Sequence, residues 1–403
     1  MAASERRVRA GLVVGALGWT IPSAAALTVL VPTVLAELVP DGKVAALAAV
    51  TISGSIAALL AAIAIGAFSD LTRSRIGARS PWMIGGAAAS ATSLLALSAA
   101  TDVASVVLCW VLFQLSMNAV IAPLKAVIAD RIPAHRLGAV SSEYGAATLA
   151  GFATGVILGA RLIAEPEVGL RLLAAVILVL PLVAVLLFRE QSNAQVPRRF
   201  SGRWSTLRAM VPPRGAPDFY LALGGRFGVM LGVSMITTFQ LYILTDYAGV
   251  STEEAAGIVT VAAVLNLVAS IIASLVSGPI SDRMGRRRAP VVLASVVIAV
   301  ATLVPLVFAE GWAMLVFATL AGFGVGIYYA VDVALMTEVL PDRQTHSRDL
   351  GILNISNTGA QALGPGASSL LVAIGLGFAP VFVVSMVVVL VGGASTLLIR
   401  SVR

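Results

Sequence analysis

Asp332 lies well inside a long apolar segment of this chain. It stands eight residues before Leu340, about 12 Å from the end of that segment at about 1.5 Å per residue along a helix. Burying an ionisable group at such a depth is costly, so these groups usually face a bundle interior or a water-filled cavity. A carboxyl group placed there can bind and release a proton. Asp332 is therefore a candidate proton-coupling residue, and a structural ion pair is the alternative.

Two cations also lie inside apolar segments, and each shares a helical face with polar side chains. At about 100° per residue, Lys125 projects about 20° and Asn118 about 40° from Gln114. In a later segment, which contains both residues, Arg226 projects within about 40° of Gln240 around the helix axis. Polar side chains that share one face of a helix indicate that this face is turned away from apolar surroundings. Such a face could bind a solute. Snorkelling of Lys125 or Arg226 to a membrane surface is the alternative.

Aromatic side chains in the apolar segments could stack on a sugar face or an aromatic ligand. Trp19 and Tyr328 are the candidates. Most aromatic residues in apolar segments serve as packing or interface anchors, which is the alternative for both.

Acidic residues at segment ends are followed by arginines in both halves of the chain. Asp70 and Asp282 end apolar segments, and Asp130 and Glu338 end two later ones at matched positions. Carboxylates beside guanidinium groups form charge-assisted pairs. Pairs that close one end of a bundle in one state bias a two-state motion. The predicted gate comprises Asp70, Arg73, Arg75, Arg79, Asp130, Asp282, Arg283, Arg286 and Glu338.

The elements that must position these residues are membrane spans. Of 403 residues, 59% are hydrophobic and 12% are charged, against about 25% charged in soluble proteins. This excludes an ordinary soluble enzyme and predicts an all-α membrane protein with twelve transmembrane helices in two six-helix bundles. The predicted domains are an N-terminal bundle at 1–188, a cytoplasmic linker at 189–217 and a C-terminal bundle at 218–403. The predicted spans are 11–38, 44–68, 82–101, 103–129, 139–163, 170–188, 218–246, 254–278, 290–309, 312–340, 350–374 and 376–399.

Lysines and arginines are distributed unequally between the two sides of these spans. Of 27, 22 fall on the side of both termini and the linker, 3 fall on the other side, and Lys125 and Arg226 lie inside spans. The positive-inside rule places the 22 in the cytoplasm. The net charge of +7 is then a sign of topology in a multi-pass protein of the cell membrane. It does not indicate a nucleic-acid partner.

The chain lacks the residues that most catalytic and cofactor sites need. The single cysteine, Cys109, has no disulfide partner, and the two histidines, His135 and His346, fall in polar loops. No Walker motif is present in the sequence. We therefore expect neither an enzyme nor a protein with a cofactor or bound metal, and we expect no direct use of ATP.

The two halves of the sequence repeat each other. Gly66 to Asp70 matches Gly278 to Asp282 at an offset of 212 residues, and Pro81 matches Pro290 at an offset of 209. Two six-helix halves related by an axis along the membrane normal are a known transporter plan.

These repeated segments resemble the loop motif of the major facilitator superfamily, Gly-x-x-x-Asp followed by a basic cluster. A finer resemblance links Ser69 to Trp82 to the corresponding loop of glycoside–pentoside–hexuronide:cation symporters and sucrose transporters. Ala78 and Ser80 interrupt the basic cluster usual in that branch. The segment 44–68 carries no acidic residue, which disfavours sodium coupling of the melibiose-permease type.

The resemblance implies a secondary transporter that moves a small organic solute, such as a sugar or glycoside, by alternating access. Its partners would be that solute, a coupling proton and the lipid bilayer. A proton-driven exporter of a drug or secondary metabolite is the alternative. That class places Gly-Pro in the fifth span, whereas Gly155 is followed here by Val156.

Overall fold

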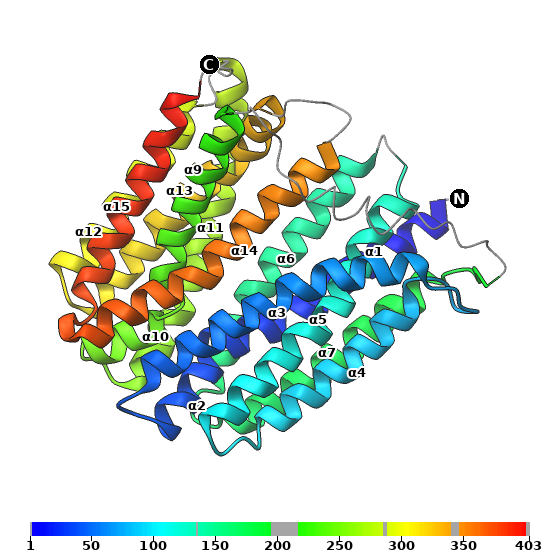
Figure 1. Ribbon diagram of the computed structural model, residues 1–403, viewed down its shortest axis with the longest axis horizontal. Helices are drawn as coiled ribbons and strands as arrows, with labels where there is room; N and C mark the ends of the chain where they lie inside the picture. The colour runs from blue at the N-terminus through cyan, green and yellow to red at the C-terminus, as the bar shows by residue number, and fades with distance from the viewer. Residues whose placement is uncertain (1, 134–135, 195–216, 285–287, 340–345, 400–403) are drawn as a thin grey trace. The chain divides into compact units, whose positions relative to one another are not determined.

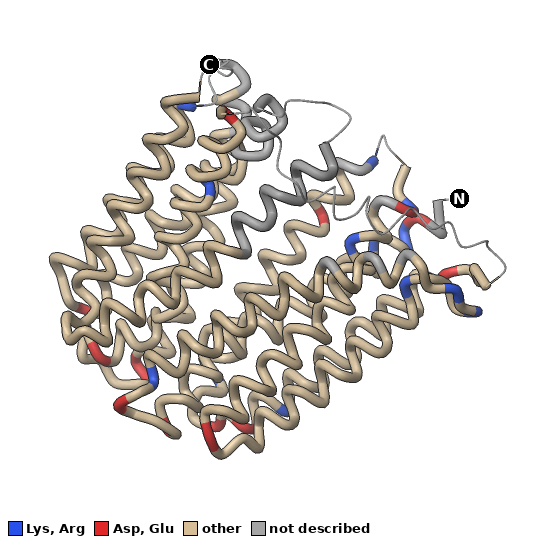
Figure 2. Tube along the Cα trace, in the orientation of Figure 1, with Lys and Arg blue, Asp and Glu red and all other residues tan. Residues whose placement is uncertain are grey.

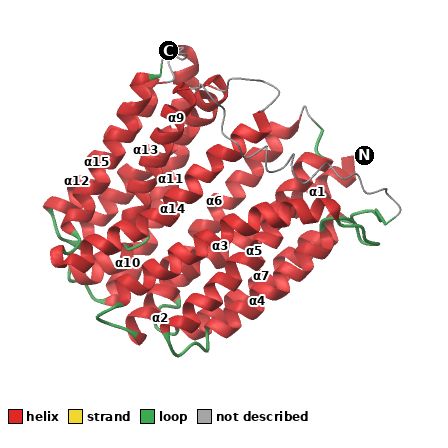
Figure 3. Cartoon of the chain, viewed as in Figure 1, coloured by secondary structure: helices red, strands yellow, loops and turns green. Residues whose placement is uncertain are grey.

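The chain folds into helices throughout the part that the structure describes. The computed structural model describes residues 2–133, 136–194, 217–284, 288–339 and 346–399. Only the backbone is described for residues 2–4, 63, 67, 70, 129, 137–138, 278–280, 282–284, 332–339 and 346–358. Among these residues there is no strand (Figure 3). The chain divides into two compact units, Met1–Phe200 and Ser201–Arg403.

The described residues of the first unit form six long helical segments, which can be followed by their labels in Figure 1. In its first segment, α1 runs through a π-helical turn, η1, into α2 without leaving the helical path. The elements are α1 (Ala2–Ala25), η1 (Ala26–Leu30), α2 (Val31–Leu38), α3 (Lys43–Leu71), α4 (Ser80–Leu97), α5 (Val103–Arg131), α6 (Leu137–Arg161) and α7 (Pro166–Phe188).

The described residues of the second unit also form six segments. Its elements are α9 (Pro217–Thr237), α10 (Gln240–Tyr242), η3 (Ile243–Tyr247), α11 (Thr252–Met284), α12 (Arg288–Val307), α13 (Gly311–Val339), α14 (His346–Leu371), η5 (Val372–Leu376), α15 (Ala379–Ser395) and η6 (Thr396–Leu398). Here α9, α10 and η3 together occupy one segment, as do α14 with η5 and α15 with η6.

The two units share one packing plan. In the first, α5 packs against α3 and α4, α1 against α6 and α7, and α4 against α7. In the second, α13 packs against α11 and α12, α9 against α14 and α15, and α12 against α15. The second set follows from the first by replacing each helix with its counterpart six segments later. This confirms the repeat predicted from the sequence.

Ten helical segments of the described chain are long and apolar enough to cross a membrane. The other two, α4 and α6, are rich in glycine, alanine, serine and threonine, which reduces their hydropathy. Counting α4 and α6, the twelve helices agree with the predicted all-α membrane fold. Charged residues gather at the helix ends and leave long uncharged middles (Figure 2).

Small residues let α1 and α6 approach closely. A Cβ atom added at Gly155 would lie 2.9 Å from Cβ of Ala24 and closer still to the carbonyl oxygen of Ile21. Gly151 and Gly159, one turn away on either side, also face the backbone or side chains of α1. The sequence Gly151, Gly155, Gly159 is thus the close-approach pattern of membrane helices.

The predicted linker at 189–217 lies mostly outside the described residues. The predicted boundaries of the two bundles at 188 and 218 therefore stay a prediction. The first residues of the linker, 189–194, are described and make defined contacts with the first unit, as shown below.

Candidate functional site

One face of the first unit combines aromatic and polar side chains. Trp19 of α1 donates a hydrogen bond from Nε1 to the hydroxyl of Tyr144 on α6, at 3.2 Å. One turn further along α1, Ser23 donates from Oγ to Sδ of Met117 on α5, at 2.8 Å. Trp19, Ser23 and Tyr144 are half-buried. Three helices therefore meet here around groups that can stack on a ligand and hydrogen-bond to it.

The predicted stripe on α5 runs next to Met117, but its members differ in exposure. Lys125 is exposed, Gln114 is half-buried and Asn118 is buried. The amide nitrogen of Asn118 donates to the backbone carbonyl of Gln114 at 2.9 Å. The amide of Asn118 therefore has a partner on its own helix, whereas Lys125 is solvent-exposed as a residue.

In the second unit the predicted residues occupy three helices. Arg226 on α9 and Gln240 on α10 are half-buried. Tyr328 on α13 is 1% exposed and belongs to the hydrophobic core, where its ring packs edge-on against Tyr329. The ring of Tyr328 is therefore a packing element in this structure. The backbone of Asp332 lies on α13, one turn further on, and its side chain is outside the described residues.

The predicted gate contains one ion pair in the described part of the chain. Arg79, at the start of α4, lies 3.0 Å from Oδ2 of Asp130 at the end of α5. The same guanidinium donates to the hydroxyl of Ser69 on α3, at 2.7 Å. Three helix ends of one unit are thus joined through Arg79. Arg73 donates to the carbonyl of Thr72 at 3.0 Å.

The other residues of the predicted gate do not test it. Arg75 is exposed. The side chains of Asp70, Asp282, Arg283 and Glu338, and the whole of Arg286, lie outside the described residues. The gate therefore stays a prediction.

Two carboxylates escaped the sequence analysis. Glu143, on α6, pairs with Arg9 of α1, with an Nε to Oε2 distance of 2.9 Å and a second, shorter contact from Nη2. Its depth inside a predicted span was the signal that could have identified it. Like Asp332, Glu143 lies several residues inside a predicted span, so it is a further candidate for binding a coupling proton.

Glu190, just after α7, binds the start of α4. Its carboxylate accepts hydrogen bonds from the backbone nitrogens of Arg79 and Ser80, at 3.0 and 2.9 Å, and from the hydroxyl of Ser80. The first amides of a helix lack partners inside the helix, and a carboxylate satisfies them well. Gly77 has a φ of 92°, and a Cβ atom there would collide with Glu190. No local sequence pattern predicts such a cap from over a hundred residues away.

Asn193 fixes the preceding connection in the same way. Its side chain accepts a hydrogen bond from the nitrogen of Ser74 at 2.8 Å and donates to the carbonyl of Thr72 at 2.9 Å. Residues 190–193 therefore hold the α3–α4 connection in place.

Solved structures resemble this chain over nearly its whole length. The nucleoside transporter NupG has a TM-score of 0.76 and 12% identity, covering 97% of this chain and 99% of that one. A bacterial homolog to the human lysosomal transporter Spinster, inward-facing and unoccupied, has a TM-score of 0.70 and 15% identity, covering 98% and 97%. Identities this low establish the fold alone. No curated protein matches the chain in sequence.

The sequence profile of the Major Facilitator Superfamily matches residues 10–269 and again residues 222–403. These two matches extend over nearly the entire chain and agree with the repeated six-helix plan. The chain therefore belongs to the Major Facilitator Superfamily, and it is a multi-pass membrane transporter, not an enzyme.

Proposed function

We propose that this transporter carries a small glycoside, a class that includes sugars joined to a base, in symport with protons. The observation that carries the proposal is the Trp19–Tyr144 pair beside Ser23. Sugar rings present an apolar face that stacks on aromatic rings and hydroxyls that need hydrogen-bond partners. Half-buried aromatic and polar side chains on one face of an otherwise apolar bundle offer both.

Lys125 supports the assignment of this face to solute binding. A charged side chain rarely faces lipid within a span, because burial of the charge in hydrocarbon is costly. Lys125 is exposed on α5, on the same helical face as Gln114. An aqueous path along this face of α5 accounts for both residues.

The coupling proton is assigned to an acidic residue inside a span. Asp332 and Glu143 are the two candidates, one on α13 and one on α6. The carboxylate of Glu143 is already engaged by Arg9 across α1 and α6. We therefore keep Asp332 as the coupling residue and use Glu143 as the comparison.

The test is uptake into proteoliposomes under imposed proton and sodium gradients, with a panel of sugars, glycosides and nucleosides. NupG is a nucleoside transporter, which is the reason to include nucleosides. We expect accumulation of one glycoside class driven by an inwardly directed proton gradient and unaffected by sodium. Accumulation driven by sodium alone would refute the proton assignment.

The same vesicles distinguish the exporter alternative. An antiporter accumulates solute when the proton gradient is directed outward from the vesicle lumen, whereas a symporter accumulates it when the gradient is directed inward. Drug-like cations belong in the panel for this reason. Accumulation of such a compound by antiport, with no glycoside transported, would replace the proposal with the exporter.

A further inference from the structure

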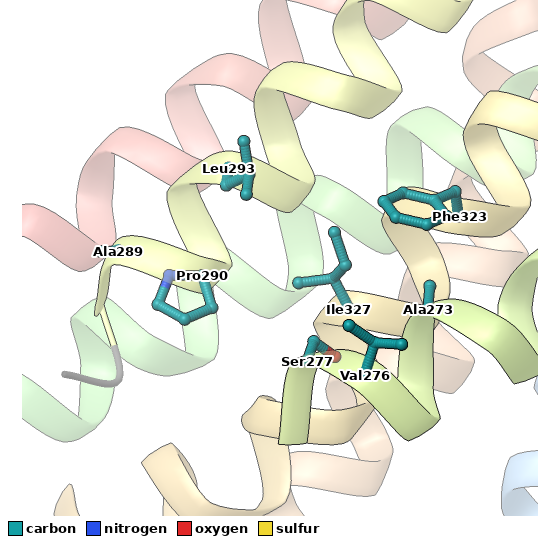
Figure 4. Close-up of a pocket in the computed structure, with 8 residues that line it drawn as sticks. All are labelled: Ala273, Val276, Ser277, Ala289, Pro290, Leu293, Phe323 and Ile327. Atoms are coloured by element: carbon teal, nitrogen blue, oxygen red, sulfur yellow. The ribbon is translucent and has the colours of Figure 1, made fainter. Parts of the chain in front are cut away.

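A pocket of about 400 Å³ lies within the second unit, between α11, α12 and α13 (Figure 4). This volume falls in the range of about 300–1,000 Å³ that small-ligand sites occupy. The side chains around it are apolar except for one hydroxyl. They are Ala273, Val276, Ser277, Ala289, Pro290, Leu293, Phe323 and Ile327.

Two buried polar atoms have no hydrogen-bond partner among the described residues, one in the pocket lining and one in the residue that precedes the lining of α12 in sequence. One is Oγ of Ser277, which lines the pocket, and the other is Nε of Arg288. Arg288 directly precedes Ala289 and Pro290, both of which line the pocket. Buried donors are nearly always satisfied, and each one left unpaired is costly. An acceptor that supplies these bonds is therefore expected at this end of the pocket.

The surface around the pocket is apolar. Ile272, Leu275 and Val276 of α11 and Leu293 of α12 are 51–71% exposed. In a membrane protein such a surface is covered by acyl chains. Leu293 lies about 7.5 Å along the helix from Arg288, at about 1.5 Å per residue, so the pocket extends from a helix start into the apolar zone.

Arg288 belongs to a basic run in the sequence. Residues 285–288 read Gly-Arg-Arg-Arg, and of these Arg288 is described. Basic pockets between helices at the membrane surface bind the phosphates of anionic lipids. An acyl chain matches the apolar pocket, and a phosphate matches the guanidinium and the hydroxyl.

The first unit provides an internal comparison. A groove at the equivalent place is lined by residues of α3, α4 and α5, including Pro81 and Leu112. The residue matching Arg288 at the offset of 209 is Arg79, which is already bound by Asp130 and Ser69. The two grooves are thus equivalent in position, and they differ at one atom: Nε of Arg79 donates to Asp130, whereas Nε of Arg288 has no partner among the described residues.

We propose that the pocket between α11, α12 and α13 is a binding site for an anionic phospholipid, with an acyl chain in the pocket and the phosphate at Arg288 and Ser277. The site is separate from the solute face of the first unit and does not depend on the proposed substrate.

The test uses the full chain in proteoliposomes that contain a trace of phosphatidylglycerol with a photoactivatable acyl chain. After illumination, labelled peptides are identified by mass spectrometry. We expect labelling of the peptides that contain Ala273 to Ser277 and Phe323 to Ile327. Phosphatidylcholine with the same chains should label them about fivefold less, since one arginine near the surface contributes about that factor.

Three variants test the two parts of the site. Arg288→Gln should reduce labelling by phosphatidylglycerol about fivefold, to the level of phosphatidylcholine. Leu293→Trp should reduce labelling by both lipids, because the indole enters the pocket from an exposed position. Leu112→Trp, in the equivalent groove of the first unit, is the matched control and should leave these peptides unchanged.

Equal labelling by the two lipids that Arg288→Gln does not alter would identify ordinary boundary lipid and overturn the proposal. Displacement of the label by a transported solute would overturn it as well, because the pocket would then belong to the solute path. Each variant is first checked for a monodisperse peak and an unchanged unfolding temperature. If Arg288→Gln fails this check, Ser277→Ala combined with Leu293→Trp decides the question.

Discussion

Arg79 concentrates several contacts in one side chain. Its side chain is 11% exposed and bonds both Asp130 and Ser69, whereas the side chain of Asp130 is 51% exposed. Exposed carboxylates in ion pairs contribute about 0–1 kcal/mol. Removing a buried donor strands its partners and costs more, about 1–3 kcal/mol. We therefore expect Arg79→Gln to lower the unfolding temperature in detergent clearly more than Asp130→Asn does.

The comparison has a built-in control, since both variants remove the same ion pair. Equal losses of stability would mean that the Ser69 contact and the burial of Arg79 contribute nothing. The expectation at this site would then be wrong.

Asp332 is the residue on which proton coupling is predicted to depend. Asp332→Asn removes the titrating group and keeps its size and most of its hydrogen-bonding capacity. We expect this variant to lose accumulation driven by a proton gradient and to retain solute exchange, measured by counterflow in proteoliposomes. Glu143→Gln is the comparison variant and should retain gradient-driven accumulation, because Glu143 is paired with Arg9. Full accumulation by Asp332→Asn would end the assignment.

At the scale of helices, the α1–α6 contact is the clearest case of geometry set by residue size. At Gly155 an added methyl group meets the backbone of α1, whereas at Gly145 on the same helix it meets nothing within 4 Å. Overpacking of this kind typically costs about 1–3 kcal/mol. Replacing a helical glycine by alanine in open space instead stabilises by about 0.5–1 kcal/mol.

We therefore expect Gly155→Ala to lower the unfolding temperature and Gly145→Ala to maintain or raise it. Thermal unfolding of both variants in the same detergent measures the difference. If the two substitutions shift the unfolding temperature alike, the close approach of α1 and α6 does not limit stability.

The helices themselves were largely predictable, because apolar runs fix them through local composition. α13 spans Gly311–Val339 where the sequence predicts 312–340, and α5 spans Val103–Arg131 where it predicts 103–129. Start signals also act locally. Asp102 caps α5 by accepting a bond from the nitrogen of Ser105 at 2.9 Å, and that bond lowers the pKa of the Asp102 carboxyl.

Contacts between distant segments were not predictable in the same way. Glu190, which follows α7 in the chain, accepts a hydrogen bond from the first residue of α4. Glu143 of α6 forms an ion pair with Arg9 of α1. Helical projection reports which face a residue occupies and not what packs against that face. For that reason it placed Asn118 and Lys125 together, although one is buried and the other exposed.

For the whole molecule, the doubled sequence pattern predicted the architecture better than any single residue predicted the site. A repeat offset of 209–212 residues requires two units of equal design, and both units show the same helix pairings. The arginines matched by the repeat nevertheless differ in their surroundings. Nε of Arg79 donates to Asp130, whereas Nε of Arg288 has no partner among the described residues, so the repeat in sequence does not fix this polar contact.

The orientation of the chain in the membrane is a further whole-molecule prediction, and it rests on the division of basic residues, 22 against 3. Cys109 is the single cysteine and is buried, so introduced cysteines report with little background. Ser192 and Thr101 are exposed, after α7 and between α4 and α5. We expect an impermeant maleimide to label Thr101→Cys in intact cells, and to label Ser192→Cys in inside-out vesicles alone. The unaltered chain provides the background for both.

Because six segments precede Ser192 and three precede Thr101, the two sites must lie on opposite sides in either orientation. The reverse labelling pattern would therefore invert the topology without questioning the fold, and it would place the Arg79 network on the outer surface.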